Sequence, residues 1–384
     1  MVTFPAALLV ALAFMVALSR PLLEARRIPA SLILVAGMLL GPSLTGMISA
    51  ELLYATAPIL ALAGGWLALS AAESWDLDTL RRSRAGRRIL LTAVPALVMV
   101  LLAILWPTAI ILARGLPALA SLLAPAVILA CASIALDPAA VRESLAQTER
   151  PGPVERLAPL AASLALGTAL AATAIASGLH ATIVTLLPWV VAWHVVGTFL
   201  FGTMIGVLFA GLIRLAQGRS AVTACLVALP LVAYGAARLM EMPPLAMTFV
   251  AGVVLANDPQ RRDLVFTILR EHHRAFTTAV LLLAGAHVPL GTAEGFHAVF
   301  WLMAASVAIA RPLAWRFVPS VGVTMDQALP MSPLAILIAQ EILYWPGSIW
   351  ILPGLTPSIV AIAFVLDEAA WLVMSRNERL ARKK

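Results

Sequence analysis

The chain is organised around the run Ile128-Leu-Ala-Cys-Ala-Ser-Ile-Ala-Leu-Asp137-Pro138-Ala-Ala-Val-Arg142. A long apolar segment leads into Asp137-Pro138, and a short helix-compatible run follows. Proline lacks a backbone donor and disfavours helix at the residue before it, so we expect the helix to open at Leu136-Asp137. In lipid, such an opening persists only where protein shields it or where it lines a water-filled cavity. The run therefore predicts a functional helix break, with Asp137 and Pro138 as its first candidate residues.

The composition places the chain in a membrane. Of its 384 residues, 62% are hydrophobic and 12% are charged, and the mean hydropathy is +0.98. Soluble domains are about 25% charged, so the predicted fold class is an all-α polytopic membrane protein. The net charge of +7 comes from basic residues in short loops, which membrane topology explains better than a nucleic-acid partner. Cys131 and Cys225 lie in apolar runs, and no P-loop, dinucleotide fingerprint or zinc spacing occurs, so we expect no enzyme, metal centre or cofactor.

About thirteen apolar runs approach the ~20 residues that a helix needs to cross a bilayer. Of the 26 Lys and Arg residues, 24 follow odd-numbered runs, among them a predicted loop at 261–274. The positive-inside rule then predicts an N-terminus outside and a C-terminus in the cytoplasm, and we expect a bacterial inner-membrane protein. The predicted spans are roughly 2–19, 28–49, 52–72, 89–113, 116–141, 157–179, 181–213, 220–240, 243–257, 274–290, 296–318, 332–353 and 356–375.

The second half of the sequence repeats the first in chain order. Pro125…Ile128-Leu129…Pro138 aligns with Pro333…Ile336-Leu337…Pro346, and matching runs are seven spans apart. Because seven is odd, two six-helix units are expected to have opposite orientations in the membrane. Inverted repeats with interrupted helices in matching positions are typical of secondary transporters, and the second break is expected at Trp345-Pro346-Gly347. The predicted division is a first repeat at 1–180, a connecting span at 181–219, a second repeat at 220–376 and a basic tail at 377–384.

Several motifs occur in an order known from one family. They are Ile28-Pro-Ala-Ser-Leu-Ile-Leu-Val-Ala-Gly-Met-Leu-Leu-Gly-Pro42, Ala135-Leu-Asp-Pro-Ala-Ala-Val141, Phe249-Val-Ala-Gly-Val-Val-Leu-Ala-Asn257 and Ala310-Arg-Pro-Leu313. The chain thereby resembles the monovalent cation/proton antiporter superfamily, which includes sodium/proton exchangers and Kef-type potassium/proton antiporters. The resemblance implies an elevator-type exchanger, usually a homodimer, in which two broken helices cross near mid-membrane. It also implies that Asp137 is the crossing aspartate and that Arg311 is the basic residue that balances the helix dipoles.

The chain departs from the family pattern in two places. Leu136 stands where the family has threonine before the aspartate. The run after the crossing, Leu157–Ile175, lacks the usual Asn-Asp or Asp-Asp pair and contains only the hydroxyl groups of Ser163, Thr168 and Thr173. The sequence is therefore that of a divergent member without the usual acidic residue in the sixth span, where Ser163 and Thr168 are the remaining candidate ligands.

Other acidic residues are candidates to complete the site. Glu341 is expected near the middle of its span, beside Gln340, where it either pairs with Arg311 or binds the ion directly. Asp367 either replaces the missing acid from the symmetry-related side or faces cytoplasmic water together with Glu368. Asp137 itself either binds the ion or caps the half-helix that begins at Pro138. Glu73, Asp76 and Asp78, beside Arg81-Arg82, are interpreted as a solvated helix end.

These features predict a secondary transporter that exchanges Na⁺ or K⁺ for protons by alternating access. Asp137, Glu341 and Asp367 are the candidate ion- and proton-binding residues, and Arg311 is their electrostatic partner. The expected partners are a monovalent cation, the proton, membrane lipids and a second copy of the chain. Two alternatives stay open: a non-transporting membrane sensor or partner subunit that keeps this scaffold, and a proton-coupled transporter of an organic anion or other small solute.

Overall fold

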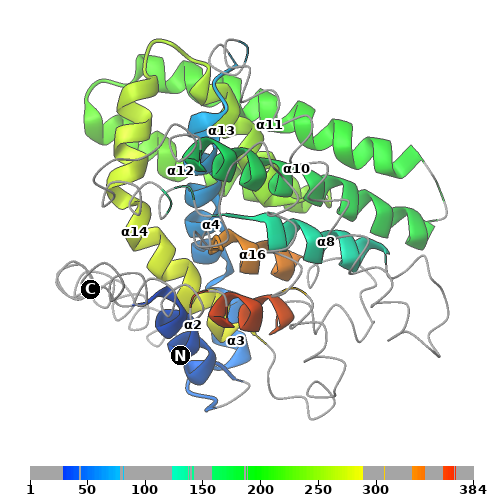
Figure 1. Ribbon diagram of the computed structural model, residues 1–384. Helices are drawn as coiled ribbons and strands as arrows, with labels where there is room; N and C mark the ends of the chain where they lie inside the picture. Colours follow the sequence, from blue (N-terminus) through cyan, green and yellow to red (C-terminus); the bar gives the residue numbers. More distant parts are fainter. Residues whose placement is uncertain are drawn as a thin grey trace, which may run out of the picture.

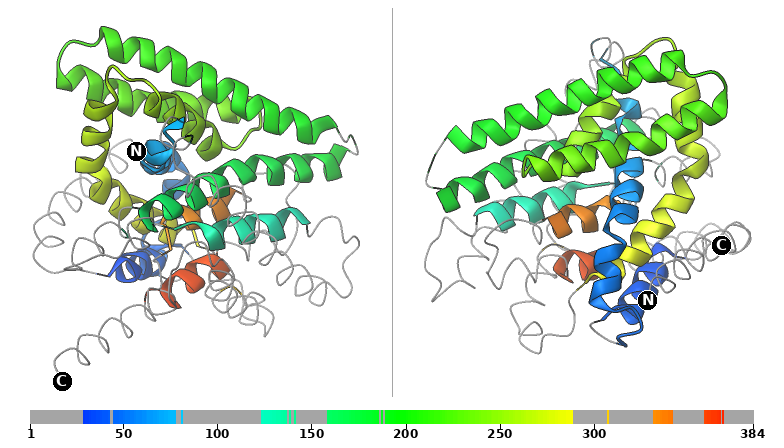
Figure 2. Two further views of the ribbon diagram at one scale, coloured as in Figure 1. Left: turned by 45° about the horizontal axis from the view of Figure 1, so that its top comes forward. Right: turned by 180° about the vertical axis from the view of Figure 1, so that it is seen from behind.

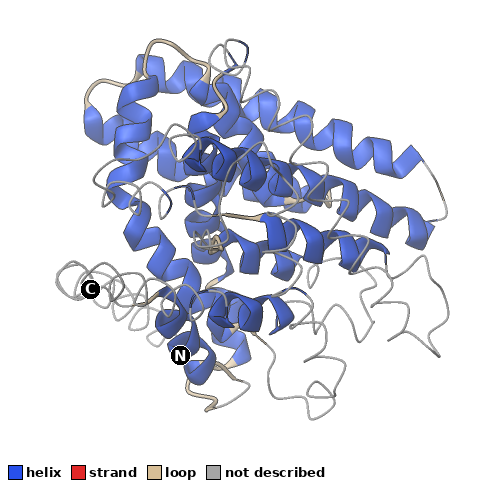
Figure 3. Cartoon of the chain, in the orientation of Figure 1, coloured by secondary structure: helices blue, strands red, loops and turns tan. Residues whose placement is uncertain are grey.

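The computed structural model describes residues 29–42, 45–77, 81, 123–136, 138, 141, 158–185, 187, 189–288, 307, 331–341, 358–366 and 368. Over this part the chain is helical and contains no β-strand, as the all-α class predicts (Figure 3). Residues 358–366 form a helix without a label. The labelled elements are α2 (Ala30–Leu40), α3 (Ala50–Ala55), α4 (Ala57–Ala71), the 3₁₀ helix η1 (Ala72–Ser74), α8 (Leu123–Ile134), α10 (Ala158–Thr185), α11 (Trp189–Leu215), α12 (Arg219–Leu239), α13 (Pro244–Ala256), α14 (Arg262–Ala286) and α16 (Leu334–Glu341).

Four of the described helical segments are long and apolar enough to cross a membrane: Ala57–Ser74, Leu160–Ala181, Trp189–Leu215 and Arg219–Leu239. They confirm the runs predicted at 52–72, 157–179, 181–213 and 220–240. The outward face of α11 is itself apolar, with Trp193, Leu200 and Leu208 between 47% and 57% exposed. A helix that is apolar on its exposed face as well as its buried face suits a bilayer and not water. The chain is therefore an integral membrane protein.

Two predicted boundaries are wrong. The loop expected at 261–274 is helical, because α14 begins at Arg262, twelve residues before the predicted span. Hydropathy misses these first turns because they carry arginine and glutamate, and the helix is held there by the ion pairs described below. The segment 181–185, predicted as the beginning of the span at 181–213, belongs instead to the end of α10. The spans predicted at 2–19, 89–113 and 296–318 lie outside the described residues, apart from residue 307.

Helices α4 and α14 pack as an antiparallel pair, with α4 in the middle of the described part and α14 along one side of it (Figures 1 and 2). The indole Nε1 of Trp66 in the middle of α4 donates to the carbonyl of Leu269, 3.1 Å away. Asp76, just after α4, meets Arg262 at the start of α14, whereas Leu53, just before α4, packs on Ala286 at its end. The pair therefore has an Arg262 end and an Ala286 end, and these names are kept below.

Helix α2 packs closely on the Ala286 end of α14 (Figure 1). Two glycines one turn apart, Gly37 and Gly41, face the α14 backbone, and a Cβ on Gly41 would lie 2.5 Å from the carbonyl oxygen of Ala286. Small residues four apart let two membrane helices approach to backbone contact, where dispersion forces and not the hydrophobic effect hold them together. The glycine spacing in this run thus fixes α2 against α14.

The helix break predicted at Asp137-Pro138 is present. Helix α8 ends at Ile134, Ala135 and Leu136 leave the helix, and helical geometry returns at Pro138. Leu136 pairs with Met331 in an isolated antiparallel bridge, and the amide of Ser332 donates to the carbonyl of Ala135 at 2.8 Å. The break at residues 135–136 therefore meets a segment 195 positions later in the chain. The break predicted at Trp345-Pro346 lies outside the described residues, and the segment that meets residues 135–136 directly precedes α16.

Candidate functional site

The site is built around the meeting of residues 135–136 with residues 331–332. Ala135 and Leu136 are 0% exposed, and Met331 and Ser332 are each 3% exposed. Each open helix end leaves backbone donors and acceptors without helical partners, and here the two segments supply partners to each other. The hydroxyl of Ser332 also accepts a hydrogen bond from the amide of Leu334 at 3.2 Å, which caps the first turn of α16. Protein thus shields the break.

Asp137, Arg311, Asp367, Trp345 and Pro346 lie outside the described residues. Asp137 is flanked by Leu136, which is fully buried, and by Pro138, which is buried and helical. Its position in the chain is therefore directly after the crossing and directly before the helix that Pro138 begins. Glu341 is the last residue of α16, and its side chain is likewise outside the description.

Gln340, one residue before Glu341, is 2% exposed. Its Nε2 donates to the carbonyl of Ala284 near the end of α14, at 2.7 Å. Its Oε1 has no hydrogen-bond partner among the described residues. The side chain also lines a cavity of about 220 Å³ at the Ala286 end of the α4–α14 pair. Gln340 is thus anchored to α14 through its nitrogen, while its buried oxygen has no partner among the described residues.

The hydroxyl groups of α10 donate to backbone carbonyls. Ser163 donates to Ala71 at 2.7 Å across the interface with α4, and Thr168 donates to Leu164 at 2.8 Å within α10. The carbonyl of Ser163 in turn accepts a hydrogen bond from Trp75 Nε1 at 3.2 Å. Ser163 therefore joins α10 to the end of α4, while the oxygen lone pairs of both hydroxyl groups stay available to a ligand.

The carboxylate of Glu368 binds the N-terminus of α2. One oxygen accepts a hydrogen bond from the amide of Ala30 at 2.8 Å, and the other accepts from the amide of Ser31. The first turn of a helix has unpaired N–H groups and a partial positive charge, both of which a carboxylate satisfies. Neither predicted role described this contact, in which Glu368 ties the final helical segment to α2.

Charged side chains that the sequence interpretation treated as solvated gather at the Arg262 end. Asp76 pairs with Arg262 at 2.8 Å, and Glu73 pairs with Arg270 at 3.6 Å. The side chain of Asp76 is only 15% exposed, so the interpretation of this helix end as solvated is wrong. Arg262 and Arg270 are two helical turns apart and share a face of α14. That spacing would have identified the pairs if the helix had been predicted from residue 262.

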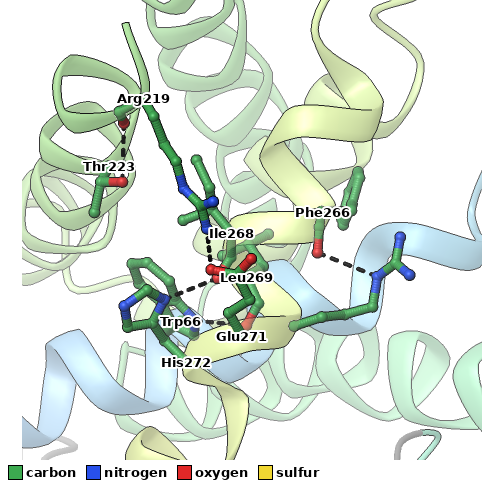
Figure 4. A network of polar contacts seen from close by, with 9 residues as sticks. Trp66, Arg219, Thr223, Phe266, Ile268, Leu269, Glu271 and His272 are labelled. Atoms are coloured by element: carbon green, nitrogen blue, oxygen red, sulfur yellow. Dashed lines mark hydrogen bonds and ion pairs between the residues drawn. The ribbon is translucent and has the colours of Figure 1, made fainter.

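The same end carries a further network, which Figure 4 shows from close by. Arg219 at the start of α12 pairs with Glu271 of α14. Trp66 stacks on Phe276, with ring centroids 4.5 Å apart, while its indole nitrogen donates to Leu269. Charges around an aromatic anchor therefore join α12, α4 and α14 at this end.

A fourth ion pair joins the end of α11 to the turn before α14. Arg214 donates to both carboxylate oxygens of Asp258, at 3.0 and 3.1 Å. Burial of Asp258 acts to raise its pKa, but the hydrogen bonds from Arg214 and the Gln260 amide, together with the charge of Arg214, outweigh that effect and hold the pKa below its usual value. Asp258 is therefore an ionised structural partner of Arg214.

Comparisons with known proteins identify a family from the sequence and a fold from solved structures. The family described as sodium/hydrogen exchanger, transmembrane, matches residues 9–336. The structure of the sodium proton antiporter MjNhaP1 from Methanocaldococcus jannaschii at pH 8 superposes with a TM-score of 0.68 at 14% identity, covering 97% of this chain and 98% of that chain. A structure from an electron-microscopy map of the same antiporter superposes with a TM-score of 0.64 at 15% identity. It covers 99% of this chain and 96% of that chain. Among curated proteins no sequence matches. At these identities the structures establish the fold.

Proposed function

The chain belongs to the sodium/hydrogen exchanger family, and on that premise we propose that it exchanges a monovalent cation for protons across a membrane by alternating access. The predicted resemblance to the cation/proton antiporters is thereby confirmed. The observation that supports the proposed activity is the meeting of Leu136 with Met331, because it joins the interrupted helix before Asp137 to the segment that precedes α16, the helix that carries Glu341. Interrupted helices in lipid mark the substrate sites of secondary transporters.

Asp137 is the proposed exchange group. A carboxylate binds either a proton or a monovalent cation. A single carboxylate site that opens to each side of the membrane in turn therefore exchanges one for the other. The helix that starts at Pro138 offers its positive end to the ionised form, while desolvation favours the protonated form. These opposing effects suit a group that must take up and release a proton in each cycle.

Five further residues are proposed to complete the site. Arg311 would offset the carboxylate charge, and Glu341 or Asp367 would supply the acid that α10 does not carry. Ser163 and Thr168 are proposed as secondary ligands. Their protons are committed to carbonyls, so the hydroxyl oxygens can only accept, which is what a cation requires.

The finer architecture is proposed together with the function. We propose thirteen spans in two inverted six-helix units at 1–180 and 220–376, joined by a connecting span at 181–219. Helix α10 continues to Thr185, past the first of these boundaries. The Arg262 end, where Arg214, Arg219 and Arg262 gather, is proposed to face the cytoplasm by the positive-inside rule. A bacterial inner-membrane homodimer remains the proposed assembly.

One observation favours a second candidate function. Helix α10 spans Ala158–Thr185 without a single Asp or Glu, although the family usually places its main acid in that span. A scaffold that has lost this acid suits a non-transporting membrane sensor or partner subunit. A transporter of an organic anion, with Arg311 as counter-charge, is the remaining alternative.

Everted membrane vesicles separate these functions. A pH gradient is imposed, Na⁺, K⁺ or Li⁺ is added, and internal pH is followed with a fluorescent dye from neutral to alkaline pH. We expect at least one cation to collapse the gradient, and Asp137→Asn to abolish the response. Asp263→Asn, the same change at an exposed acid in the first turn of α14, should leave it intact. A gradient that no cation collapses, with Asp137→Asn indistinguishable from wild type, would leave the non-transporting scaffold as the better account.

A further inference from the structure

A cavity of about 220 Å³ lies at the Ala286 end of the α4–α14 pair, where the first turns of α4 meet the last turns of α12, the start of α13 and α16. Most of its wall is carbon, as in Leu60 of α4 and Leu245 of α13. Apolar cavities of about 150 Å³ stay dry and bind molecules of the size of benzene. The cavity is therefore large enough for a longer apolar group.

The two buried polar side chains in the wall do not make this a polar site. Thr248, which is 2% exposed, donates its hydroxyl proton to the carbonyl of Pro244 at 2.8 Å. Gln340, also 2% exposed, donates from Nε2 to the carbonyl of Ala284 in α14, and its oxygen is fully buried. Neither side chain is placed to bind a charged or hydrated ligand, so we expect an apolar occupant.

The edge of the cavity is charged and lies at the end of a membrane-crossing helix. Tyr234 and Arg238 are one turn apart near the end of α12, and Glu241 follows in the turn to α13. Leu239, next to Arg238, is 88% exposed, as expected of a side chain that faces lipid. Tyrosine, and arginine with its apolar stem, are common where a membrane helix reaches the headgroup region. The cavity therefore opens at the boundary between acyl chains and headgroups.

Glu241 has a backbone conformation that glutamate rarely adopts. Its φ is 57°, and the amide of Met242 donates to the carbonyl of Ala237 at 2.9 Å, which closes the end of α12. Glycine or asparagine usually occupies this left-handed position after a helix. Residues other than glycine in this conformation are found preferentially at functional and ligand-binding sites. The turn thus places an exposed carboxylate at the cavity edge, at a position that favours glycine.

We propose that this cavity binds a zwitterionic phospholipid such as phosphatidylethanolamine, with the end of one acyl chain inside and the headgroup over the edge. The phosphate of that headgroup is negative and its ammonium group is positive, so they match Arg238 and Glu241, three positions apart and both exposed. An anionic lipid such as phosphatidylglycerol matches the arginine alone and is repelled by the carboxylate. The bilayer itself supplies the apolar occupant that the cavity requires.

The bound chain also contacts α16, the helix that carries Glu341. Leu337 of α16 lines the cavity and packs against Gly64 of α4, where a Cβ would lie 2.5 Å from Leu337 Cδ1. An acyl chain beside this contact adds dispersion contacts to both helices. A ligand stabilises the conformation that it binds, so the lipid holds α16 against α4. Lipid binding in this cavity does not depend on the proposed exchange function.

Photo-crosslinking of the purified full-length protein locates the acyl chain. Phosphatidylethanolamine with a diazirine near the end of one acyl chain is added in detergent and illuminated, and the labelled peptides are mapped by mass spectrometry. We expect the label on α4, α12, α13 and α16 around the cavity. Ala61→Phe fills the cavity from its half-buried wall and should reduce that label at least about fivefold.

Ala224→Phe is the matched control, because it introduces the same ring at an exposed position of α12 outside the cavity. It should leave the label unchanged. Label that is spread along the outward faces of α11 and α12, and that is the same in both variants, would overturn the proposed site.

Headgroup competition tests the edge without relying on Ala61→Phe. Labelling is competed with unlabelled phosphatidylethanolamine or phosphatidylglycerol of the same acyl chains. We expect wild type to prefer phosphatidylethanolamine about threefold, which is the size of an exposed ion pair. Glu241→Gln should lose this preference, whereas Asp263→Asn, at an exposed acid of α14 far from the cavity, should keep it. Equal competition by the two lipids in wild type, or by a nonionic detergent as effectively as by phosphatidylethanolamine, would overturn the proposal.

Discussion

The two ends of the α4–α14 pair differ in how completely their polar side chains are paired. At the Arg262 end, carboxylates and guanidinium groups meet in pairs, as in Asp76–Arg262 at 2.8 Å. At the Ala286 end, the amide nitrogen of Gln340 donates to the carbonyl of Ala284, while its buried oxygen has no hydrogen-bond partner among the described residues. The charged groups of the first end pair with each other, whereas the second end keeps one buried acceptor without a partner among the described residues.

We therefore expect substitutions at the two ends to affect different properties, namely stability at one end and cation exchange at the other. Removing one member of a half-buried ion pair leaves the other charge without its partner, so changes at the Arg262 end should lower stability. Changes that disturb Gln340 should instead alter cation exchange, because Gln340 directly precedes Glu341 in α16. The predictions below test that separation, and each uses thermal unfolding of the purified protein beside exchange activity.

The largest effect is expected where α2 packs on the Ala286 end. Gly41→Leu places a side chain against the backbone of Ala286, and overpacking of this kind costs about 3 kcal/mol. The shift of α14 should also disturb Ala284 and so the anchoring of Gln340. We expect a clearly lower unfolding temperature and a raised apparent KM for the cation.

Gly211→Ala is the matched control, because nothing lies within 4 Å of a Cβ at that position in α11. Alanine is about 1 kcal/mol better than glycine in a helix, so the unfolding temperature should hold or rise. If Gly41→Leu unfolds at the wild-type temperature, the close α2–α14 contact is not present in the membrane.

Asp76→Asn should have the next largest effect, at the Arg262 end. It removes the negative charge that faces Arg262 at a position 15% exposed, a loss of about 1–3 kcal/mol. The apparent KM for the cation should stay at its wild-type value. An unchanged unfolding temperature combined with a changed KM would contradict the separation of the two ends.

Glu368→Gln should produce a smaller loss. The amide keeps one acceptor oxygen but cannot accept at both positions from the amides of Ala30 and Ser31, and it removes a negative charge from the N-terminus of α2. Loss of such a cap costs about 1 kcal/mol. Glu51→Gln, in the first turn of the short and exposed helix α3, is the control and should be nearly neutral.

The smallest effect concerns pH. Because Arg214 holds the pKa of Asp258 below its unfolded value, this ion pair stabilises the fold above the unfolded pKa of about 3.9 and ceases to do so as pH falls through the folded pKa. The unfolding temperature of wild type should therefore exceed that of Asp258→Asn by a constant margin at neutral and mildly acidic pH. That margin should shrink below about pH 4. A margin that grows on acidification would reverse the assigned direction.

Local signals in the sequence predict much of the fold. Uninterrupted apolar runs identify α10, α12 and α13, and Pro138 marks the break after Ile134, since proline acts on the residues beside it. The start of α14 is missed because arginines in its first turns lower the hydropathy, although their partners Glu73 and Asp76 make the helix stable there.

Contacts between distant residues account for what sequence reasoning could not supply. Leu136 meets Met331, and Glu368 caps a helix 338 positions earlier in the chain, and neither contact leaves a local pattern. Gln340 could be named as a companion of Glu341, but the direction of its oxygen depends on the carbonyl of Ala284 in another helix. Residue type thus predicts candidates, and packing decides which of their atoms remain available.

The most direct test of the central claim is tracer uptake by purified protein in proteoliposomes. An outward proton gradient is imposed, and uptake of labelled Na⁺, or of Rb⁺ as a substitute for K⁺, is followed in wild type and in Asp137→Asn. The proposed exchange predicts cation accumulation that stops when the gradient is dissipated and that is lost in Asp137→Asn. Gradient-driven uptake that persists undiminished in Asp137→Asn, or the absence of any uptake by a folded wild-type protein, would contradict it.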